Sequence, residues 1–145
     1  MAAPAIWTVP DVLNAARAHN TGMLVEHLGI EFIAAGEDWL EARMPVVLHN
    51  KQPAGLLRGG ASVVLAESLA SMGCFLTLDQ ATQSCVGLEI NANHLRGARE
   101  GFVYGRATPL HRGRSTQVWE IRLRDDKDRA TCISRCTMAV LSRRD

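Results

Sequence analysis

The chain has 145 residues, of which 47% are apolar and 21% are charged, and its formal net charge is +1. This composition is ordinary for a globular protein, and we expect residues 1–145 to form one domain that buries about two-thirds of its unfolded surface. The near-neutral charge gives no indication of nucleic-acid binding. The N-terminal segment has no basic stretch followed by a long apolar core, so we expect no secretion signal and a cytoplasmic location.

The first third of the chain predicts a short helix followed by a β-hairpin. Pro10 and Asp11 open an amphipathic stretch that is typical of a helix start. Alternating apolar and polar residues over 30–34 and 39–44 then predict two paired strands. Residues 45–57 are rich in proline, glycine and amides, so we expect a loop there.

Residues 59–78 predict one long helix that is apolar almost all round. These twenty residues contain a single charged side chain, Glu67. The length would suit a bilayer span, but Glu67, the hydroxyl side chains, the glycines and the strand-like segments that follow argue against it. We therefore expect a buried helix and no membrane association.

After residue 79 the apolar period changes to two, which is the period of a strand. Four strands are predicted near residues 86–93, 102–106, 118–124 and 130–141. Together with the hairpin they make about six strands, enough for one curved antiparallel sheet wrapped around the long helix. The predicted fold class is α+β.

Glu67 requires a physical explanation, because a lone carboxylate in a water-poor helix is costly unless it is paired, hydrogen-bonded or protonated. One interpretation is a structural Glu67 paired with an arginine. The other is chemical: Gly59 and Gly60 leave the first-turn N–H groups open to a ligand, and Ser71 lies one turn beyond Glu67. Such a site suits addition to a carbonyl, with Glu67 as nucleophile or activator of water. The residues alone leave both interpretations open.

The cysteines and the arginines limit the possible ligands. The four cysteines lack the paired spacing of zinc ribbons and redox motifs, so we expect free thiols in a reducing compartment. No histidine spacing suggests a metal. Residues 94–124 hold seven arginines against Glu100 and Glu120. This basic segment suits the phosphates of a nucleotide or coenzyme, and a solvated sheet edge is the alternative.

Several motifs in order resemble the hotdog-fold acyl-CoA thioesterases, over a region from about Leu13 to Leu141. They are Gln-Pro-Ala-Gly-Leu-Leu-Arg-Gly-Gly-Ala-Ser at 52–62 with Leu-Ala-Glu-Ser at 65–68, Val-Gly-Leu-Glu-Ile-Asn-Ala-Asn-His at 86–94, Pro-Leu-His at 109–111 and Trp-Glu-Ile at 119–121. The likeness is strongest to the 4-hydroxybenzoyl-CoA thioesterase-like branch, which includes 1,4-dihydroxy-2-naphthoyl-CoA thioesterases and the proofreading thioesterases of enterobactin synthesis. The resemblance implies a hotdog fold and hydrolysis of an aryl-CoA or carrier-protein thioester.

The resemblance also implies roles for individual residues. Glu67 matches the catalytic carboxylate, and the Gly59 N–H matches the group that polarises the thioester oxygen. Gln52 matches a loop amide that orients substrate or water, and Ser71 matches a hydroxyl near the carboxylate. Relatives are homotetramers, made as dimers of dimers, whose sites lie between two subunits. The loop with Gln52 and the helix with Glu67 would then come from different chains.

Substrate contacts are implied at eight further positions. The acyl group and the adjoining arm would meet Ala54, Leu57 and Gly60, and the coenzyme phosphates would meet His94, Arg96, His111, Arg112 and Arg114. Coenzyme A is part of the substrate, so no separate cofactor is expected.

Two positions depart from the family pattern. Relatives carry histidine where this chain has Arg58, and close relatives carry an aromatic residue at Ala54. Arg58 pointing inward could pair with Glu67, whereas Arg58 pointing outward would leave the site without a positioning group. Either case predicts turnover about 10- to 100-fold weaker than with histidine. A hotdog protein that binds acyl-CoA without hydrolysing it is the alternative, and a hotdog dehydratase using His49 is a weaker one.

Overall fold

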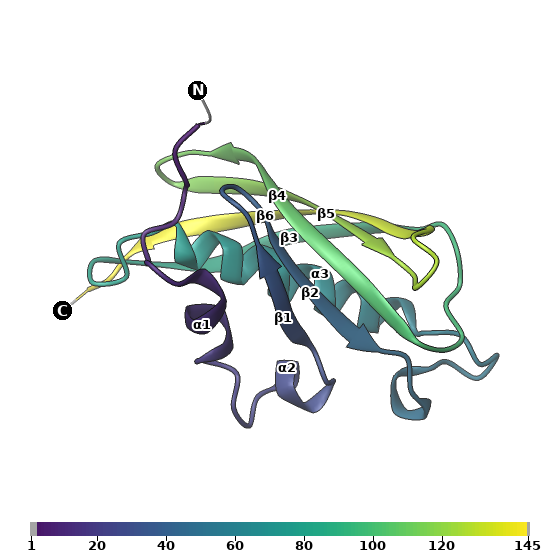
Figure 1. Ribbon diagram of the computed structural model, residues 1–145. Coiled ribbons are helices and arrows are strands. Elements are labelled where there is room, and N and C mark those ends of the chain that lie inside the picture. Colours follow the sequence, from purple (N-terminus) through teal and green to yellow (C-terminus); the bar gives the residue numbers. More distant parts are fainter. Residues whose placement is uncertain (1–2, 145) are drawn as a thin grey trace.

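The computed structural model describes residues 3–144 and contains one six-stranded antiparallel sheet beside one long helix (Figure 1). The strand order is β1-β2-β4-β5-β6-β3. The strands are β1 (Glu31–Ala35), β2 (Leu40–Pro45), β3 (Gln83–His94), β4 (Phe102–Arg112), β5 (Thr116–Arg124) and β6 (Ala130–Ser142); the helices are α1 (Val12–Arg17), α2 (Leu24–His27), the 3-10 turn η1 (Leu48–Asn50) and α3 (Gly59–Leu76). The predicted fold class and the order of the predicted elements are confirmed, whereas α2 and η1 were not predicted.

The core lies between α3 and the concave face of the sheet. Leu65, Leu69 and Cys74 on one side of α3 are fully buried, and they face inward-pointing strand residues such as Leu40 and Ile121. Burial of this apolar area is the main stabilising contribution to the fold. Among residues 3–144, α3 is also the one helix long and apolar enough for a bilayer span by composition. Its packing against the sheet explains that composition, because a central core helix has the same requirements.

Trp119 organises the end of the core near the C-terminus of α3. The indole is fully buried, stacks on Trp7 with ring centroids 6.4 Å apart, and donates from Nε1 to Gln117 Oε1 at 2.8 Å. Gln117 Nε2 in turn donates to Thr77 Oγ1 at 2.9 Å. Gly73 gives this ring its space, since a Cβ there would lie 2.9 Å from Trp119 Cη2.

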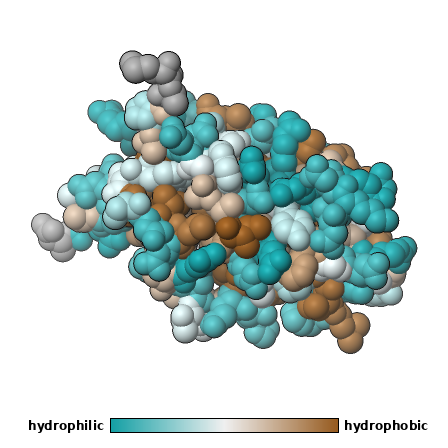
Figure 2. Space-filling view, viewed as in Figure 1, coloured by the Kyte–Doolittle hydropathy of each residue, from teal (hydrophilic) through white to brown (hydrophobic). Residues whose placement is uncertain are grey.

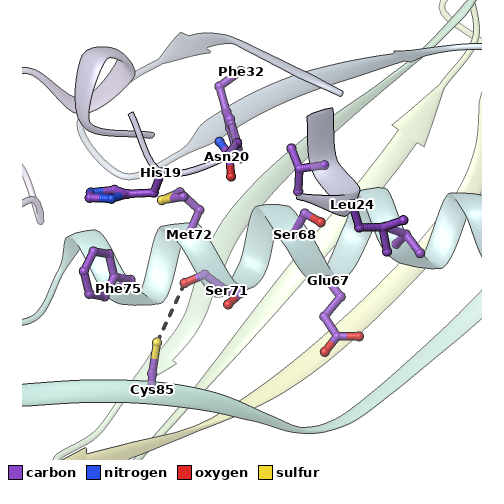
Figure 3. Close-up of a pocket in the computed structure, with 12 residues that line it drawn as sticks. His19, Asn20, Leu24, Phe32, Glu67, Ser68, Ser71, Met72, Phe75 and Cys85 are labelled. Atoms are coloured by element: carbon purple, nitrogen blue, oxygen red, sulfur yellow. Dashed lines mark hydrogen bonds between the residues drawn. The ribbon is translucent and has the colours of Figure 1, made fainter. Parts of the chain in front are cut away.

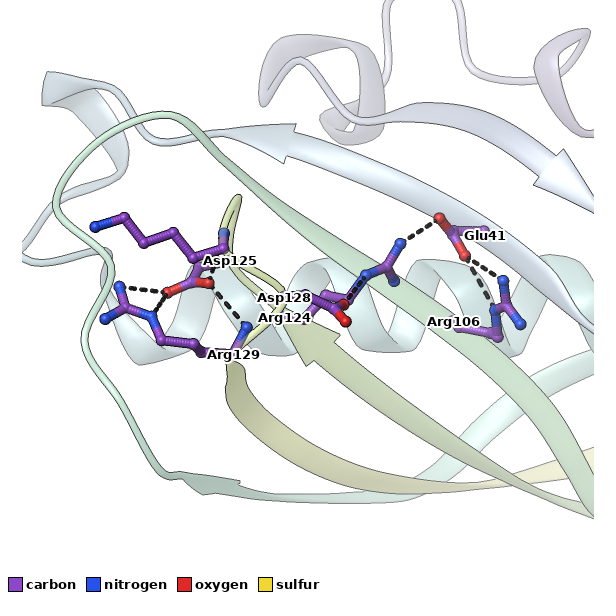
Figure 4. Close-up of polar contacts among 7 residues, drawn as sticks. Glu41, Arg106, Arg124, Asp125, Asp128 and Arg129 are labelled. Carbon is purple, nitrogen blue, oxygen red and sulfur yellow. Dashed lines mark hydrogen bonds and ion pairs between the residues drawn. The ribbon is translucent and has the colours of Figure 1, made fainter.

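The convex face of the sheet carries a buried acid, Glu41, that is paired with two arginines (Figure 4). Its oxygens accept from Arg106 at 3.0 Å and from Arg124 at 2.8 Å. Arg124 also pairs with Asp128 at 3.0 Å, and Arg106 lies over the Trp39 ring at 3.8 Å. The acid is therefore compensated, as a buried carboxylate must be. This ion-pair network holds β2, β4 and β5 together on the side away from α3.

We expect Gly73→Ala to destabilise the protein. Alanine in an open helix position normally stabilises by up to about 1 kcal/mol, but overpacking a filled core costs about 1–3 kcal/mol and the buried Trp119 ring has little room to move. Chemical denaturation at fixed protein concentration would measure the change. Gly60→Ala is the matched control, because a Cβ at Gly60 meets nothing within 4 Å. Equal stability of the two variants would contradict the packing role of Gly73.

Candidate active site

An open groove of about 570 Å³ runs along the side of α3 that the sheet does not cover. Figure 3 shows Glu67 on this side, with its carboxylate directed toward β3. The groove is lined by His19, Asn20, Leu24, Val25, Phe32, Val64, Glu67, Ser68, Ser71, Met72, Phe75 and Cys85. Glu67 is exposed, so the expectation of a carboxylate in a water-poor environment is wrong for the single chain. A helix sequence that is apolar almost all round does not reveal which side of the helix the sheet leaves exposed.

The groove combines apolar walls with a few polar groups. Met72 and Phe75 continue the open side of α3 beyond Ser71, and His19 meets Phe75 edge-on with ring centroids 6.1 Å apart. Met72 and Phe75 are half-buried, because they pack against the core and also line the groove. Their spacing from Glu67 along the helix could have indicated that they line the same groove. Phe32 and His19 arrive from other elements, so no local pattern could place them.

Cys85 on β3 is the cysteine that borders this groove. Its thiol is half-buried and donates to the Ser71 carbonyl oxygen at 3.8 Å. A hydrogen bond from Cys74 lowers the pKa of Cys85, whereas burial, aided by the charges of Glu67 and Glu89, raises the pKa of Cys136 to about 12. All four cysteines are free thiols, as predicted.

A second cavity of about 360 Å³ lies at the N-terminus of α3. It brings together Gln52, Leu57, Gly59, His94 and Arg96 from the predicted site. Ser62 and Thr131 also line it and were not predicted; the buried Thr131 Oγ1 has no hydrogen-bond partner within the described part of the chain. Short hydroxyl residues in a strand and a helix carry no local signal of this kind.

Gly59 at the start of α3 lies against the imidazole of His94. A Cβ on Gly59 would lie 2.9 Å from His94 Nε2. Within residues 3–144, no acceptor is present for the backbone N–H groups of Gly59 and Gly60, since the first bonded groups of the helix are those of Ala61 and Ser62. These free N–H groups and the helix dipole favour a negatively charged oxygen at this point.

The loop before α3 is held by its own backbone and by the segment after β3. Gln52 Oε1 accepts from the Ala54 N–H, and Gln52 N donates to Leu56 O at 2.8 Å. Leu57 N donates to Ala98 O at 2.7 Å, and Arg99 Nη1 donates to Ala54 O at 3.3 Å. The side-chain amide nitrogen of Gln52 makes no hydrogen bond to residues 3–144, which leaves it free for a ligand.

Gly59 and Glu67 do not share a cavity in one chain. They are eight residues apart on a straight helix, which corresponds to about 12 Å along its axis. One carbonyl group cannot reach both the Gly59 N–H and the Glu67 carboxylate of one chain. The expectation from the residues alone, a complete site on a single helix, is therefore wrong. The resemblance implied two subunits instead, and the separation of the two cavities is consistent with that arrangement.

The five basic residues assigned to coenzyme binding also separate into two groups. His94 and Arg96 lie in the cavity at the start of α3. The β4–β5 hairpin carries the other three, His111, Arg112 and Arg114. Arg112 lies opposite Gln117 in the strand register, and Gln117 contacts Thr77 just beyond the C-terminus of α3. A single chain therefore does not gather the five side chains into one phosphate site.

Arg58 occupies the N-cap position of α3. Its carbonyl oxygen accepts from Ala61 N at 3.0 Å, while its side chain is exposed and makes no ion pair within residues 3–144. The inward arrangement, in which Arg58 pairs with Glu67, is therefore absent from the single chain. In the same part of the protein, no three metal-ligating side chains lie close enough together to hold an ion.

Comparison with known proteins gives a consistent assignment. Residues 54–132 match the model of the thioesterase superfamily. The chain is 52% identical over 136 residues to the 1,4-dihydroxy-2-naphthoyl-CoA hydrolase of Escherichia coli, covering 94% of this chain and 99% of that protein. It is 48% identical over 136 residues to a proofreading thioesterase of Cronobacter turicensis, with coverage of 94% and 98%.

Solved structures show the same relationship. A mutant thioesterase of Pseudomonas aeruginosa, in which a glutamine is replaced by alanine, superposes with a TM-score of 0.93 at 47% identity, covering 96% of this chain and 100% of that one. A thioesterase of Haemophilus influenzae gives a TM-score of 0.90 at 44% identity, covering 94% and 95%. The chain therefore belongs to the thioesterase superfamily, and the protein is a thioester hydrolase.

Proposed function

We propose that the protein hydrolyses an aryl-CoA thioester to the free acid and coenzyme A, with Glu67 as the catalytic carboxylate. The observation that carries this proposal is the place of Glu67, an unpaired acid in an open groove whose walls are largely apolar. A flat acyl group can pack on Met72, Phe75 and Phe32 while its thioester carbonyl lies at the carboxylate. No separate cofactor is needed, because coenzyme A belongs to the substrate.

The chemical step requires a nucleophile and an oxyanion donor at the same carbonyl. Glu67 attacks the thioester carbon, or removes a proton from a water that does, and the carbonyl oxygen becomes negatively charged. The N–H of Gly59 at the start of α3 in a second chain stabilises that oxygen, and the thiolate of coenzyme A then leaves and takes up a proton. Where Glu67 is the nucleophile, water then hydrolyses the acyl-Glu67 anhydride, which releases the free acid and restores the carboxylate. The free amide nitrogen of Gln52 orients the water or the substrate, and Ser71 supplies a hydroxyl beside Glu67.

Two copies of the chain are needed to bring these groups together, and we propose a homotetramer built from two such dimers. The edge strand β3 offers unpaired backbone groups, and its Val86 and Leu88 are 50% and 61% exposed. Figure 2 shows a hydrophobic patch at lower right, over the η1 turn, where Leu48 is 89% exposed. Pairing of two chains through β3 and the open side of α3 would cover the exposed side chains of Val86 and Leu88.

The name of one relative supports an aromatic acyl group, and that of another supports a thioester substrate. One relative is named a 1,4-dihydroxy-2-naphthoyl-CoA hydrolase and another a proofreading thioesterase. The coenzyme would reach His94 and Arg96 at one end of the site. His111, Arg112 and Arg114 would come from another subunit, because they lie at the far end of α3 from the N–H donors. The small, exposed Ala54 leaves the acyl region wider than an aromatic residue would.

We expect Glu67→Gln to lower kcat by about 10³-fold or more, because an amide neither attacks the carbonyl nor accepts a proton from water. Release of free thiol from benzoyl-CoA, 1,4-dihydroxy-2-naphthoyl-CoA and octanoyl-CoA would measure it. The two aryl substrates should give the higher kcat/KM with the unmodified protein. Turnover by Glu67→Gln within tenfold of the unmodified protein would exclude the assigned role, and a preference for octanoyl-CoA would exclude the aryl assignment.

Mixing two inactive variants would test whether the site is shared between chains. Glu67→Gln and Gln52→Ala are each expected to be weak, but in a mixed dimer the intact Gln52 of one chain meets the intact Glu67 of the other. Random pairing places one complete site in half of the dimers, so activity should recover to about one-quarter of the unmodified level. Refolding the two variants together and separately, then assaying thiol release, provides the comparison. No recovery in the mixture would mean that both groups act within one chain.

Arg58→His is expected to raise kcat by about 10- to 100-fold. A neutral imidazole at the start of α3 can donate or accept a hydrogen bond at the thioester, whereas the exposed guanidinium only donates and makes no ion pair with Glu67 in the chain. Steady-state thiol release is the measurement, with Arg58→Gln as the control for loss of charge alone. An unchanged or lower rate for Arg58→His would contradict the expected gain.

A further inference from the structure

The carboxylate of Glu67 lies directly over Gly87 of β3. Glu67 Oε1 is 2.8 Å from the point that a Cβ on Gly87 would occupy, and Glu67 Cδ is 3.7 Å from it. The first separation is inside van der Waals contact, so a side chain at position 87 and the present position of the carboxylate exclude each other. Glycine at this position leaves a bare patch of backbone under the acid.

A β-bulge in β3 directly follows this patch. The pairing of β3 with β6 shifts between Gly87, opposite Met138, and Glu89, opposite Thr137, so that Leu88 is an extra residue. Bulges of this kind re-aim side chains and occur beside active sites. Here the bulge follows the stretch in which Cys85 and Gly87 face α3. Cys85 meets the carbonyl of Ser71, and Gly87 meets Glu67 one turn earlier on the helix.

Within the described chain, no polar contact holds the Glu67 carboxylate, and the surface of β3 limits its position on one side. Neither oxygen of Glu67 accepts a hydrogen bond from residues 3–144, and no cation pairs with it there. Glu89, an acidic residue of β3 itself, is held separately, because its two carboxylate oxygens accept from Asn91 Nδ2 at 3.1 and 3.3 Å. The surface under Glu67 is therefore the feature that limits where its oxygens can lie.

We propose that Gly87 is a positioning residue for the reaction, one that acts through Glu67 by keeping the strand surface under the carboxylate free of a side chain. This role rests on the proposed catalytic function of Glu67. Any larger residue at position 87 displaces the carboxylate from its present place over the strand, and so changes its alignment with the thioester carbonyl. A displacement of about 1 Å can reduce turnover by as much as 10²-fold without loss of binding.

The same geometry predicts that Gly87→Ala changes the rate far more than the fold. The new methyl group would meet the far end of a flexible, exposed side chain, and that side chain can rotate away at little cost. We expect kcat to fall about 10- to 100-fold, KM to change less than about threefold, and the midpoint of thermal unfolding and the oligomer size to stay unchanged.

A double-mutant cycle with Glu67→Asp tests whether the effect passes through the carboxylate. Aspartate is one methylene shorter, so its oxygens do not reach the methyl group of Gly87→Ala. Glu67→Asp alone lowers kcat, and adding Gly87→Ala to it should lower kcat little further. Steady-state thiol release by the four proteins gives the coupling. Effects that multiply, or a Gly87→Ala protein with unchanged kcat, would overturn the proposal.

Gly105→Ala is the matched structural control. Gly105 is another strand glycine facing α3, but its added Cβ would lie 2.7 Å from Leu69 Cδ1 in the core. It should lower the unfolding midpoint, and its effect on kcat should multiply with that of Glu67→Asp. If Glu67→Gln abolishes turnover while the Gly87 cycle is multiplicative, the catalytic role of Glu67 stands and the role of Gly87 fails. If Glu67→Gln keeps its turnover, both fail.

Discussion

The packing of one side of α3 against the concave sheet is the interaction on which the rest of the structure depends. Leu65, Leu69 and the residues that share their side of the helix are removed from water by the strands, while the opposite side lines an open groove whose other walls come from α2, β1 and the segment after α1. One interaction therefore has two results. It stabilises the fold, and it determines that Glu67 lies on the side of the helix that remains exposed.

Because α3 is a continuous helix, the free N–H groups at its start and the carboxylate of Glu67 cannot approach one another. The free N–H groups are at its first turn, and the acid is more than two turns further along. The fold thus provides both groups that the proposed reaction needs but keeps them apart within one molecule. The loop from Gln52 to Leu57 is held to the segment after β3 by hydrogen bonds, which gives the cavity at the start of α3 a defined shape.

The sequence predicted the fold well, because strand and helix periods are local properties and Gly59, Pro10 and Asp11 mark real helix starts. It also singled out Glu67 by its isolation among apolar residues. The exposure of Glu67 was missed because periodicity does not say which side a sheet will cover. Phe32 and His19 were missed because only tertiary packing brings them to the groove. The bulge at Leu88 has no signal in the alternation, and so the contact between Gly87 and Glu67 was not foreseen.

The edge strand β3 has a consequence for the newly synthesised chain. Twelve residues of open hydrogen-bonding edge form a template that any extended polypeptide can join, including an unfolded copy of the same protein. The interruption at Leu88 breaks the regular ladder near its middle, which disfavours long pairings in a wrong register. Protection of this edge during folding therefore comes partly from the irregularity that follows Gly87 in β3.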